Sequence, residues 1–177
     1  AFGYDLPERL IAQAPIRPRD AARMLVVRAE GLAHHGVLDL PALLEPGDVM
    51  VVNDTRVIPA RLHGRRGAAR VEIMLNRAEG GGRWQALVRN ARRLRPGDEI
   101  AIEGAEGCRA LVLEREGGTA LLDFGPDPAA LAAALETAGE VPLPPYIHRD
   151  SGPRAEDRAD YQTIFARRPG AVAAPTA

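Results

Sequence analysis

The sequence contains no lysine, so all 23 of its basic residues are arginine. It has one cysteine, Cys108, which excludes an internal disulfide and leaves no partner for a metal site of the usual spacing. Aromatic residues make up only 4% of the chain, so aliphatic side chains must build the core. No run approaches the roughly 18 apolar residues of a membrane helix, and the amino terminus lacks signal-peptide features. We therefore expect a cytoplasmic protein that binds neither membrane nor metal.

Charge is distributed unevenly along the chain, although the formal net charge is only −1. Residues 56–95 carry 11 arginines against two acids, Glu72 and Glu79, which gives a local balance of +9. Residues 96–160 carry 5 arginines against 14 acids, a balance of −9. A basic block of this density suits a phosphate-bearing partner. Alternatively, the acidic block folds against these arginines and neutralises them, and charge alone leaves both interpretations open.

One stretch joins an apolar segment to a dense polar cluster. Residues 49–52 are Val-Met-Val-Val, and four consecutive apolar side chains predict a strand buried on both faces. Asn53, Asp54, Thr55 and Arg56 follow directly. We expect the buried strand to hold these four hydrogen-bonding groups at its carboxyl end, a common place for a ligand site in mixed α/β folds.

The chemistry of this polar cluster allows two interpretations. Asn and Thr side chains donate and accept hydrogen bonds, an ionised Asp only accepts, and Arg presents a planar fork to a carboxylate or phosphate. The same residues suit a structural turn in which Asp54 pairs with Arg56 or Arg61. The local sequence is equally compatible with a ligand site and with a turn.

The middle of the chain has the pattern of an antiparallel β module. Short stretches with alternating or partly alternating apolar residues predict strands at 70–75, 83–89, 99–103, 109–114 and 119–124. Glycine-rich turns separate them, including Gly80-Gly81-Gly82 and the Pro96-Gly97 step. Several short strands separated by turns indicate a meander or a small barrel.

The segments before and after this module have helical or extended sequence patterns. A strand is predicted at 23–28. Asp127 as N-cap, Pro128 at the first helical position and a left-handed Gly139 delimit a predicted helix over 129–138. Three prolines between residues 142 and 145 predict a rigid extended path that can orient Tyr146 and Arg149. A second helix is expected at 161–166.

Four motifs in order resemble the S-adenosylmethionine:tRNA ribosyltransferase-isomerase family of queuosine biosynthesis. They extend over nearly the whole chain, which begins with a matching Tyr4-Asp5-Leu6-Pro7. The motifs are Asn-Asp-Thr-Arg-Val-Ile-Pro-Ala-Arg at 53–61, Val-Pro-Leu-Pro-Pro-Tyr-Ile at 141–147, Tyr-Gln-Thr at 161–163 and Pro-Gly-Ala-Val-Ala-Ala-Pro-Thr-Ala at 169–177.

The resemblance implies a fold of the α/β class plus an all-β insert. A mixed α/β catalytic domain would be built from both chain ends, residues 1–59 and 138–177, with an inserted antiparallel β-barrel at 60–137. Family members continue beyond Ala177 for a further half of the protein. A site assembled from both halves would therefore be incomplete in this chain.

The resemblance also implies a reaction. The ribosyl part of S-adenosylmethionine is transferred to 7-aminomethyl-7-deazaguanine at the wobble position of tRNAs with queuosine-type anticodons and rearranges to epoxyqueuosine, while adenine and methionine leave. S-adenosylmethionine is consumed as a substrate, and no separate cofactor or metal is implied.

The expected site residues follow from the matched motifs. We expect Asp54 and Arg56 in catalytic roles and a further set near the substrates: Asn53, Thr55, Arg61, Tyr146, Arg149, Ala173, Ala174, Pro175 and Thr176. Five arginines of the basic block are candidates for RNA contact: Arg65, Arg66, Arg92, Arg93 and Arg95. The alternative function is a non-catalytic RNA-binding β module that uses these arginines without performing the reaction.

Overall fold

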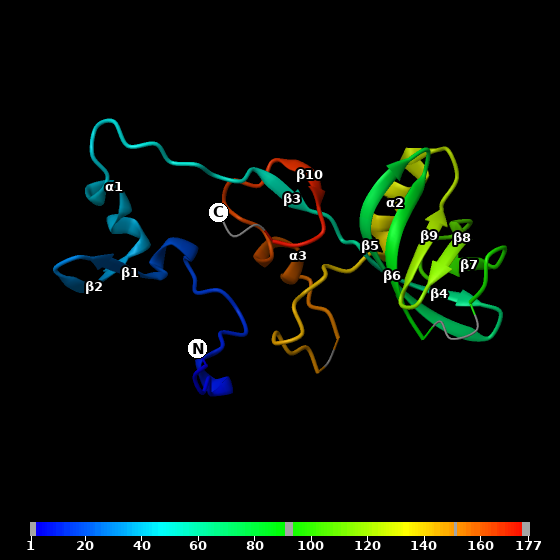
Figure 1. Ribbon diagram of the computed structural model, residues 1–177, viewed down its shortest axis with the longest axis horizontal. Coiled ribbons are helices and arrows are strands. Elements are labelled where there is room, and N and C mark those ends of the chain that lie inside the picture. Colours follow the sequence, from blue (N-terminus) through cyan, green and yellow to red (C-terminus); the bar gives the residue numbers. More distant parts are fainter. Residues whose placement is uncertain (1–2, 91–93, 151, 175–177) are drawn as a thin grey trace. The chain divides into compact units, whose positions relative to one another are not determined.

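The computed structural model describes residues 3–90, 94–150 and 152–174, which form two compact units (Figure 1). One unit consists of residues up to Val52 and of Pro145–Asp150. The other consists of Asn53–Pro144 and of residues 152–174.

The first unit contains a β-hairpin and several short helices. Strand β1 (Arg23–Arg28) pairs antiparallel with β2 (Gly31–Gly36), which confirms the strand predicted at 23–28. The Gln13 side chain donates to the Tyr146 carbonyl at 3.0 Å and accepts from the His148 N–H at 2.7 Å, so it fixes the segment after the prolines. The remaining elements are η1 (Glu8–Leu10), η2 (Arg19–Ala21), η3 (Val37–Asp39) and α1 (Leu40–Leu43).

The prediction of a buried strand at residues 49–52 is wrong. This segment forms no strand, and all four side chains are exposed, with Val49 at 86% and Val51 at 81% of full exposure. A strand requires a hydrogen-bonding neighbour, and no described segment pairs with the backbone here. The strand that does form, β3 (Thr55–Val57), begins three residues later.

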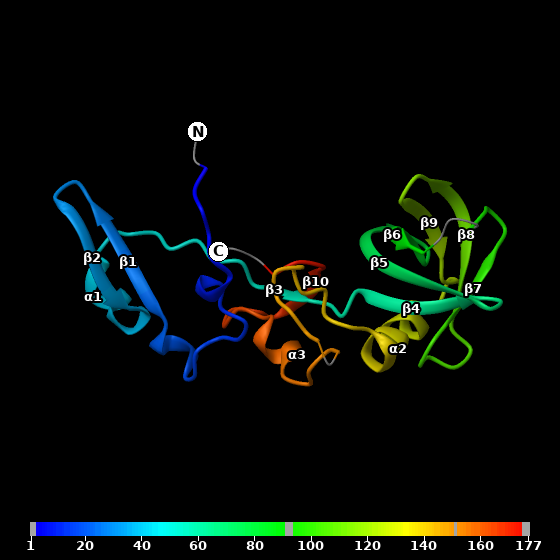
Figure 2. The same ribbon diagram turned by 90° about the horizontal axis from the view of Figure 1, so that it is seen from below.

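A closed six-stranded antiparallel barrel dominates the second unit (Figures 1 and 2). Its strands are ordered β4-β5-β6-β9-β8-β7 around the barrel, and the predicted antiparallel β module is confirmed. The strands are β4 (Arg61–Arg66), β5 (Ala69–Gly80), β6 (Arg83–Arg89), β7 (Glu99–Ile102), β8 (Arg109–Glu116) and β9 (Thr119–Asp123).

Alternation along these strands fills the barrel with aliphatic side chains. In β7, for example, Ile100 and Ile102 are buried while Glu99 and Ala101 face solvent. Each fully buried side chain of this size stabilises the fold by about 1.5–3 kcal/mol. The largest of them are Leu62, Ile73, Leu75, Ile100, Leu122 and Val112, so the core needs no aromatic ring at its centre.

The barrel closes where β4 meets β7, and Gly64 makes that contact possible. Gly64 is the register partner of Ile102, and Arg65 is the partner of Ala101. A Cβ atom at position 64 would lie 2.6 Å from Cγ2 of Ile100 and 2.9 Å from the Ala101 carbonyl oxygen. Because both distances are shorter than van der Waals contact allows, only glycine lets the two strands approach closely enough to pair.

Helix α2 (Pro128–Ala138) packs on the barrel through Leu131 and Leu135, which belong to the same buried core as the strands. The predicted N-cap is confirmed, because Oδ1 of Asp127 accepts the Ala129 N–H at 2.9 Å. The predicted left-handed Gly139 is wrong, since its φ is −76°.

The carboxyl end of α2 receives its hydrogen bonds from a distant side chain instead. The Arg158 guanidinium donates to the carbonyl oxygens of Glu136 at 2.9 Å and Gly139 at 2.8 Å. Arg158 lies on α3 (Asp157–Asp160), and because residues 161–166 form turns, the helix predicted there is also wrong. A long-range arginine therefore satisfies carbonyls that a helix end leaves unpaired.

The chain enters and leaves the barrel at one place. Arg61 begins β4 and forms an isolated antiparallel bridge with Glu140, just after α2. The Arg61 N–H donates to the Glu140 carbonyl at 3.1 Å, and the Glu140 N–H donates to the Arg61 carbonyl at 2.8 Å. Outside the barrel, β3 pairs in parallel with β10 (Arg168–Ala171).

Two glycines of the β5–β6 hairpin tip allow a controlled test of packing. Gly82 has φ +81°, and a Cβ atom there would overlap the carbonyl oxygen of Gly125. Gly81 has φ +60°, but its Cβ would meet nothing closer than the Arg83 guanidinium at 3.8 Å. We expect Gly81→Ala to lower the free energy of unfolding by about 1–2 kcal/mol, the cost of left-handed backbone.

Gly82→Ala should be clearly more destabilising than Gly81→Ala, because it adds a collision with backbone to the same conformational cost. Urea unfolding of both variants beside the parent chain measures this difference. Equal losses for the two variants would show that the Gly82–Gly125 approach is not required.

Candidate active site

The polar cluster predicted from the sequence lies at the start of β3. Asn53 and Asp54 precede the strand, and Thr55 and Arg56 lie within it. Oδ1 of Asn53 accepts the Thr55 N–H at 2.9 Å and also the Thr55 hydroxyl. This Asx turn is the structural role that the sequence allowed for the cluster, and it fixes the backbone that leads into β3.

Asp54 connects β3 to β10. Its carbonyl oxygen accepts the N–H groups of Arg167 at 2.7 Å and Arg168 at 3.0 Å, and its carboxylate lies 3.3 Å from Nε of Arg168. The sequence predicted a partner in Arg56 or Arg61, but the partner is Arg168, more than 100 residues away. Asp54 is half-buried, so its carboxylate contacts Arg168 and still reaches solvent.

Gln162 fixes the other end of β3. Its Oε1 accepts the Val57 N–H at 2.9 Å, and its Nε2 donates to the Val57 carbonyl at 2.9 Å. The side-chain amide thereby supplies the pair of bonds that a neighbouring strand would supply. The hydroxyl of the adjacent Thr163 is buried without a hydrogen-bond partner among the residues that the structure describes.

Local sequence around Gln162 and Arg168 predicts no contact of these side chains with β3. Both residues could have been singled out by their position, because Gln162 belongs to the Tyr-Gln-Thr motif and Arg168 precedes the Pro-Gly motif. Neither motif shows by itself that its side chain reaches residues 54–57.

Arg56 differs from its neighbours because its side chain is exposed. It is the register partner of Pro169 across the β3–β10 ladder, and no described carboxylate pairs with its guanidinium. A guanidinium on a strand that Asp54, Arg168 and Gln162 hold in place is suited to bind a carboxylate or a phosphate.

The other predicted substrate-binding residues are dispersed. Arg61 begins β4, with Nε 3.7 Å from a carboxylate oxygen of Glu72. Tyr146 and Arg149 belong to the first unit; Tyr146 is exposed, and Arg149 donates to the His148 carbonyl at 2.8 Å. Ala173 and Ala174 follow β10, whereas Pro175 and Thr176 lie outside the described residues.

Comparison with known proteins gives a family for the whole sequence. A family model described as queuosine biosynthesis protein matches residues 1–177. The chain belongs to the queuosine biosynthesis protein family. This match confirms the resemblance of the sequence to a family of queuosine biosynthesis.

Similar proteins in this family carry one name. The chain is 56% identical over 177 residues to the S-adenosylmethionine:tRNA ribosyltransferase-isomerase of Acidiphilium cryptum, covering 99% of this chain and 51% of the relative. It is 55% identical over 177 residues to the protein of that name from Rhodospirillum rubrum, covering 99% of this chain and 50% of the relative. The chain thus spans about half the length of the curated relatives it matches.

A solved structure belongs to the same group. The crystal structure of S-adenosylmethionine tRNA ribosyltransferase from Thermotoga maritima is 40% identical, covers 69% of this chain and 43% of that chain, and has a TM-score of 0.34.

The arginine block of this family member is partly neutralised by the acidic block. Arg65 lies 2.5 Å from Glu103, and Arg66 lies 2.8 Å from Asp98. Arg95 is exposed and donates its backbone N–H to the Asp98 carboxylate. Arg92 and Arg93 lie outside the described residues. Two of the proposed RNA contacts, Arg65 and Arg66, are thus already paired with carboxylates.

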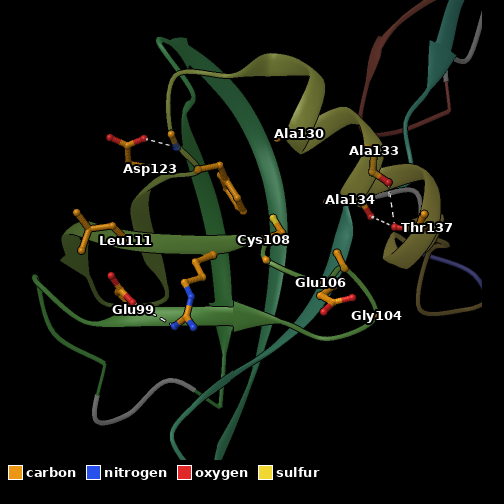
Figure 3. Close-up of a pocket in the computed structure, with 15 residues that line it drawn as sticks. Glu99, Gly104, Glu106, Cys108, Leu111, Asp123, Ala130, Ala133, Ala134 and Thr137 are labelled. Carbon is orange, nitrogen blue, oxygen red and sulfur yellow. Dashed lines mark hydrogen bonds and ion pairs between the residues drawn. The ribbon is translucent and has the colours of Figure 1, made fainter.

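A cavity of about 850 Å³ lies between the β7–β8–β9 side of the barrel and α2, apart from β3 (Figure 3). Carboxylates of Glu99, Glu106 and Asp123 line it beside Arg109, which pairs with Glu99 at 3.3 Å. Cys108 lies one residue before β8 and also lines the cavity. Partial burial raises the pKa of its thiol, which disfavours the nucleophilic thiolate.

No group of three or more His, Cys, Asp or Glu side chains in the described part of the chain could hold a metal ion. His34 and His35 lie on β2, where His35 approaches Asp39 at 3.6 Å. Among the described residues, no helix has the length and apolar character needed to cross a membrane.

We expect the stability of the folded chain to depend on pH through the Asp98 carboxyl, which pairs with Arg66. The Arg95 backbone N–H, and after it the Arg66 guanidinium, lower the pKa of the Asp98 carboxyl below its ordinary value of 3.8. A carboxyl whose pKa is lowered in the folded state stabilises that state above the unfolded pKa, and this stabilisation disappears as pH falls through the folded pKa.

We therefore expect Asp98→Asn to unfold at a lower temperature than the parent chain at pH 7. The difference should narrow below about pH 4 as the parent carboxylate becomes protonated. Thermal melts at several pH values measure it, with Asp150→Asn as an exposed control. A difference that stays constant down to the lowest pH would contradict the assignment.

Proposed function

We propose that this chain is part of an enzyme that transfers the ribosyl moiety of S-adenosylmethionine to tRNA and isomerises it. The observation that carries the proposal is the family match over residues 1–177, with relatives of this name at 51–56% identity. The acceptor is 7-aminomethyl-7-deazaguanine at the wobble position, the product is epoxyqueuosine, and adenine and methionine leave. Such an enzyme acts on cytoplasmic tRNA.

In this proposal, residues 1–59 and 138–177 contribute to an α/β catalytic domain built from both chain ends, and residues 60–137 form the inserted barrel domain. The parallel pairing of β3 with β10 supports the first part, because residues 55–57 and 168–171 share one small sheet. The Arg61–Glu140 bridge supports the second part, because it joins the two points where the chain crosses into the barrel.

The β3 residues have the chemistry that such substrates require. S-adenosylmethionine carries a carboxylate and tRNA carries phosphates, and the exposed Arg56 guanidinium binds either group through paired hydrogen bonds. The Asp54 carboxylate, which lies 3.3 Å from Nε of Arg168, accepts a hydrogen bond from a ribose hydroxyl or an amine. We assign Asp54 and Arg56 to the reacting centre.

The remaining predicted residues are proposed to line the substrates around that centre. Asn53 and Thr55 are included because their turn sets the backbone of β3. The other members of the set are Arg61, Tyr146, Arg149, Ala173, Ala174, Pro175 and Thr176.

Arg56→Ala tests the site directly. Loss of a charge-assisted contact worth about 1.5–3 kcal/mol should lower kcat/KM for adenine release by about 10- to 150-fold. The protein, expressed with any sequence that continues it in its gene, is incubated with S-adenosylmethionine and precursor tRNA. Adenine is quantified by chromatography, and the tRNA is digested to detect epoxyqueuosine.

Arg70→Ala is the matched control, because Arg70 is an exposed arginine on β5, away from β3. Unchanged turnover in Arg56→Ala would remove Arg56 from the site. No adenine release by the parent protein would overturn the proposed function.

The alternative, a non-catalytic RNA-binding module, is supported by exposed arginines on the barrel, including Arg83 and Arg89. Both functions predict that tRNA affinity falls with salt, by a slope of about −0.7 to −0.9 in log affinity against log salt for each phosphate contact. Only the enzyme releases adenine. A flat salt response would contradict arginine-mediated binding in either function.

A further inference from the structure

A second cavity, of about 390 Å³, lies where the barrel, α2 and β10 come together within the second unit. The tip of the β5–β6 hairpin, the helix and the strand each contribute part of the wall. The lining is mostly apolar and includes Ile58, Trp84, Leu131, Leu135 and Pro169. Its volume is within the range of small-ligand pockets.

Trp84 gives this cavity an aromatic wall. It is the only tryptophan in the chain, and it lies half-buried on β6, where it packs against the barrel core and also lines the cavity. No described residue accepts a hydrogen bond from its indole N–H. An indole ring with an accessible side is the surface on which unpaired nucleobases stack.

Arg83 gives the cavity its charge. Among the described residues that line it, Arg83 is the only charged one, and no described carboxylate pairs with its exposed guanidinium. Its partner across the β6–β9 ladder, Asp123, lines the larger cavity instead and accepts the Gly125 N–H at 2.8 Å (Figure 3). The smaller cavity is therefore an apolar pocket with one cation and no anion.

The cavity also adjoins the strand pair that carries the candidate site. Pro169 and Gly170 of β10 line it, and Pro169 is the register partner of Arg56 on β3. Neighbouring strands lie about 4.8 Å apart, so the cavity wall and the Arg56 backbone are separated by one strand spacing. A nucleotide in the cavity would lie next to one bound at β3.

We propose that this cavity holds one unpaired nucleobase of the tRNA, stacked on Trp84 with its phosphate at Arg83. The proposal rests on the proposed function, because it assigns a position to the RNA substrate of that site. Its effect is to hold the RNA strand by a base other than the one that reacts.

Charge favours RNA over S-adenosylmethionine as the occupant. S-adenosylmethionine carries two cationic groups, the sulfonium and the ammonium, against one carboxylate, so Arg83 would repel its net positive charge in a pocket without a carboxylate. Charge also argues against RNA in the larger cavity, where Glu99, Glu106 and Asp123 outnumber Arg109. The smaller cavity therefore suits a base with a phosphate.

The single tryptophan makes the test direct. Trp84 fluorescence is followed while the 177-residue chain is titrated at low salt with an anticodon stem-loop RNA. We expect quenching that saturates with RNA binding, because a stacked base contacts the indole. The same stem as a fully paired duplex, and S-adenosylmethionine alone, should leave the Trp84 signal unchanged.

Variants then separate stacking from charge. Trp84→Leu keeps the cavity apolar but removes the ring, and should weaken stem-loop binding by about 5- to 150-fold, the range for one stacked base. Trp84→Phe should retain most of the affinity. Arg83→Gln should weaken stem-loop binding and make the slope of log affinity against log salt shallower by the amount expected for about one phosphate contact. Arg70 lies outside the cavity, so Arg70→Gln should leave the quenching of Trp84 fluorescence by the RNA intact.

Stem-loop binding that leaves Trp84 fluorescence unchanged would overturn the proposal while the proposed function stands. Quenching by S-adenosylmethionine alone would overturn it as well, because the occupant would then be the other substrate. If the Trp84 variants fail to fold, parent quenching and Arg83→Gln still decide the question. No RNA binding at any salt concentration would overturn both this inference and the RNA part of the proposed function.

Discussion

Closure of the barrel between β4 and β7 is the constraint on which the second unit depends. A sheet of six strands has two free edges unless its first and last strands pair, and here they pair because position 64 has no side chain. Closure removes exposed edges and encloses an aliphatic core. It also gives α2 a fixed surface, so that Arg158 can reach the end of that helix from a segment near β10.

The barrel could be predicted from sequence because its signals are local. Alternation within β7 and a glycine turn beside it identify a strand without reference to any other segment. The N-cap of α2 is local for the same reason. The left-handed conformation predicted for Gly139 is wrong because the side chain of Arg158 donates hydrogen bonds to the end of this helix. No local pattern indicates a contact with an arginine nineteen residues away.

Residues 49–52 illustrate the opposite case. Their apolar pattern is real, but a strand exists only when a neighbour accepts its hydrogen bonds, and pattern alone supplies no neighbour. Prediction of the candidate site from local sequence is limited in the same way. Motif order indicated that Asp54 and Arg56 matter, whereas the Arg168 ion pair and the Gln162 clamp depend on contacts over more than 100 residues.

The arginines of the basic block differ in what they can contact, although the sequence makes them look alike. Arg65 and Arg66 approach acids that follow them in the chain, so part of the local charge is cancelled within the fold. Arg70 and Arg83 remain exposed without a carboxylate within ion-pair distance among the described residues. The positive field at the surface therefore depends on which carboxylates the folded barrel places beside the arginines of the basic block.

The bridge between Arg61 and Glu140 has a consequence for how an insertion is accommodated in the fold. Backbone hydrogen bonds hold the two crossings side by side, so the two ends of the almost 80 residues between them meet at one place. Insertions survive where the ends of the host chain stay close together. The barrel segment meets that condition, because its two ends lie side by side at the Arg61–Glu140 bridge.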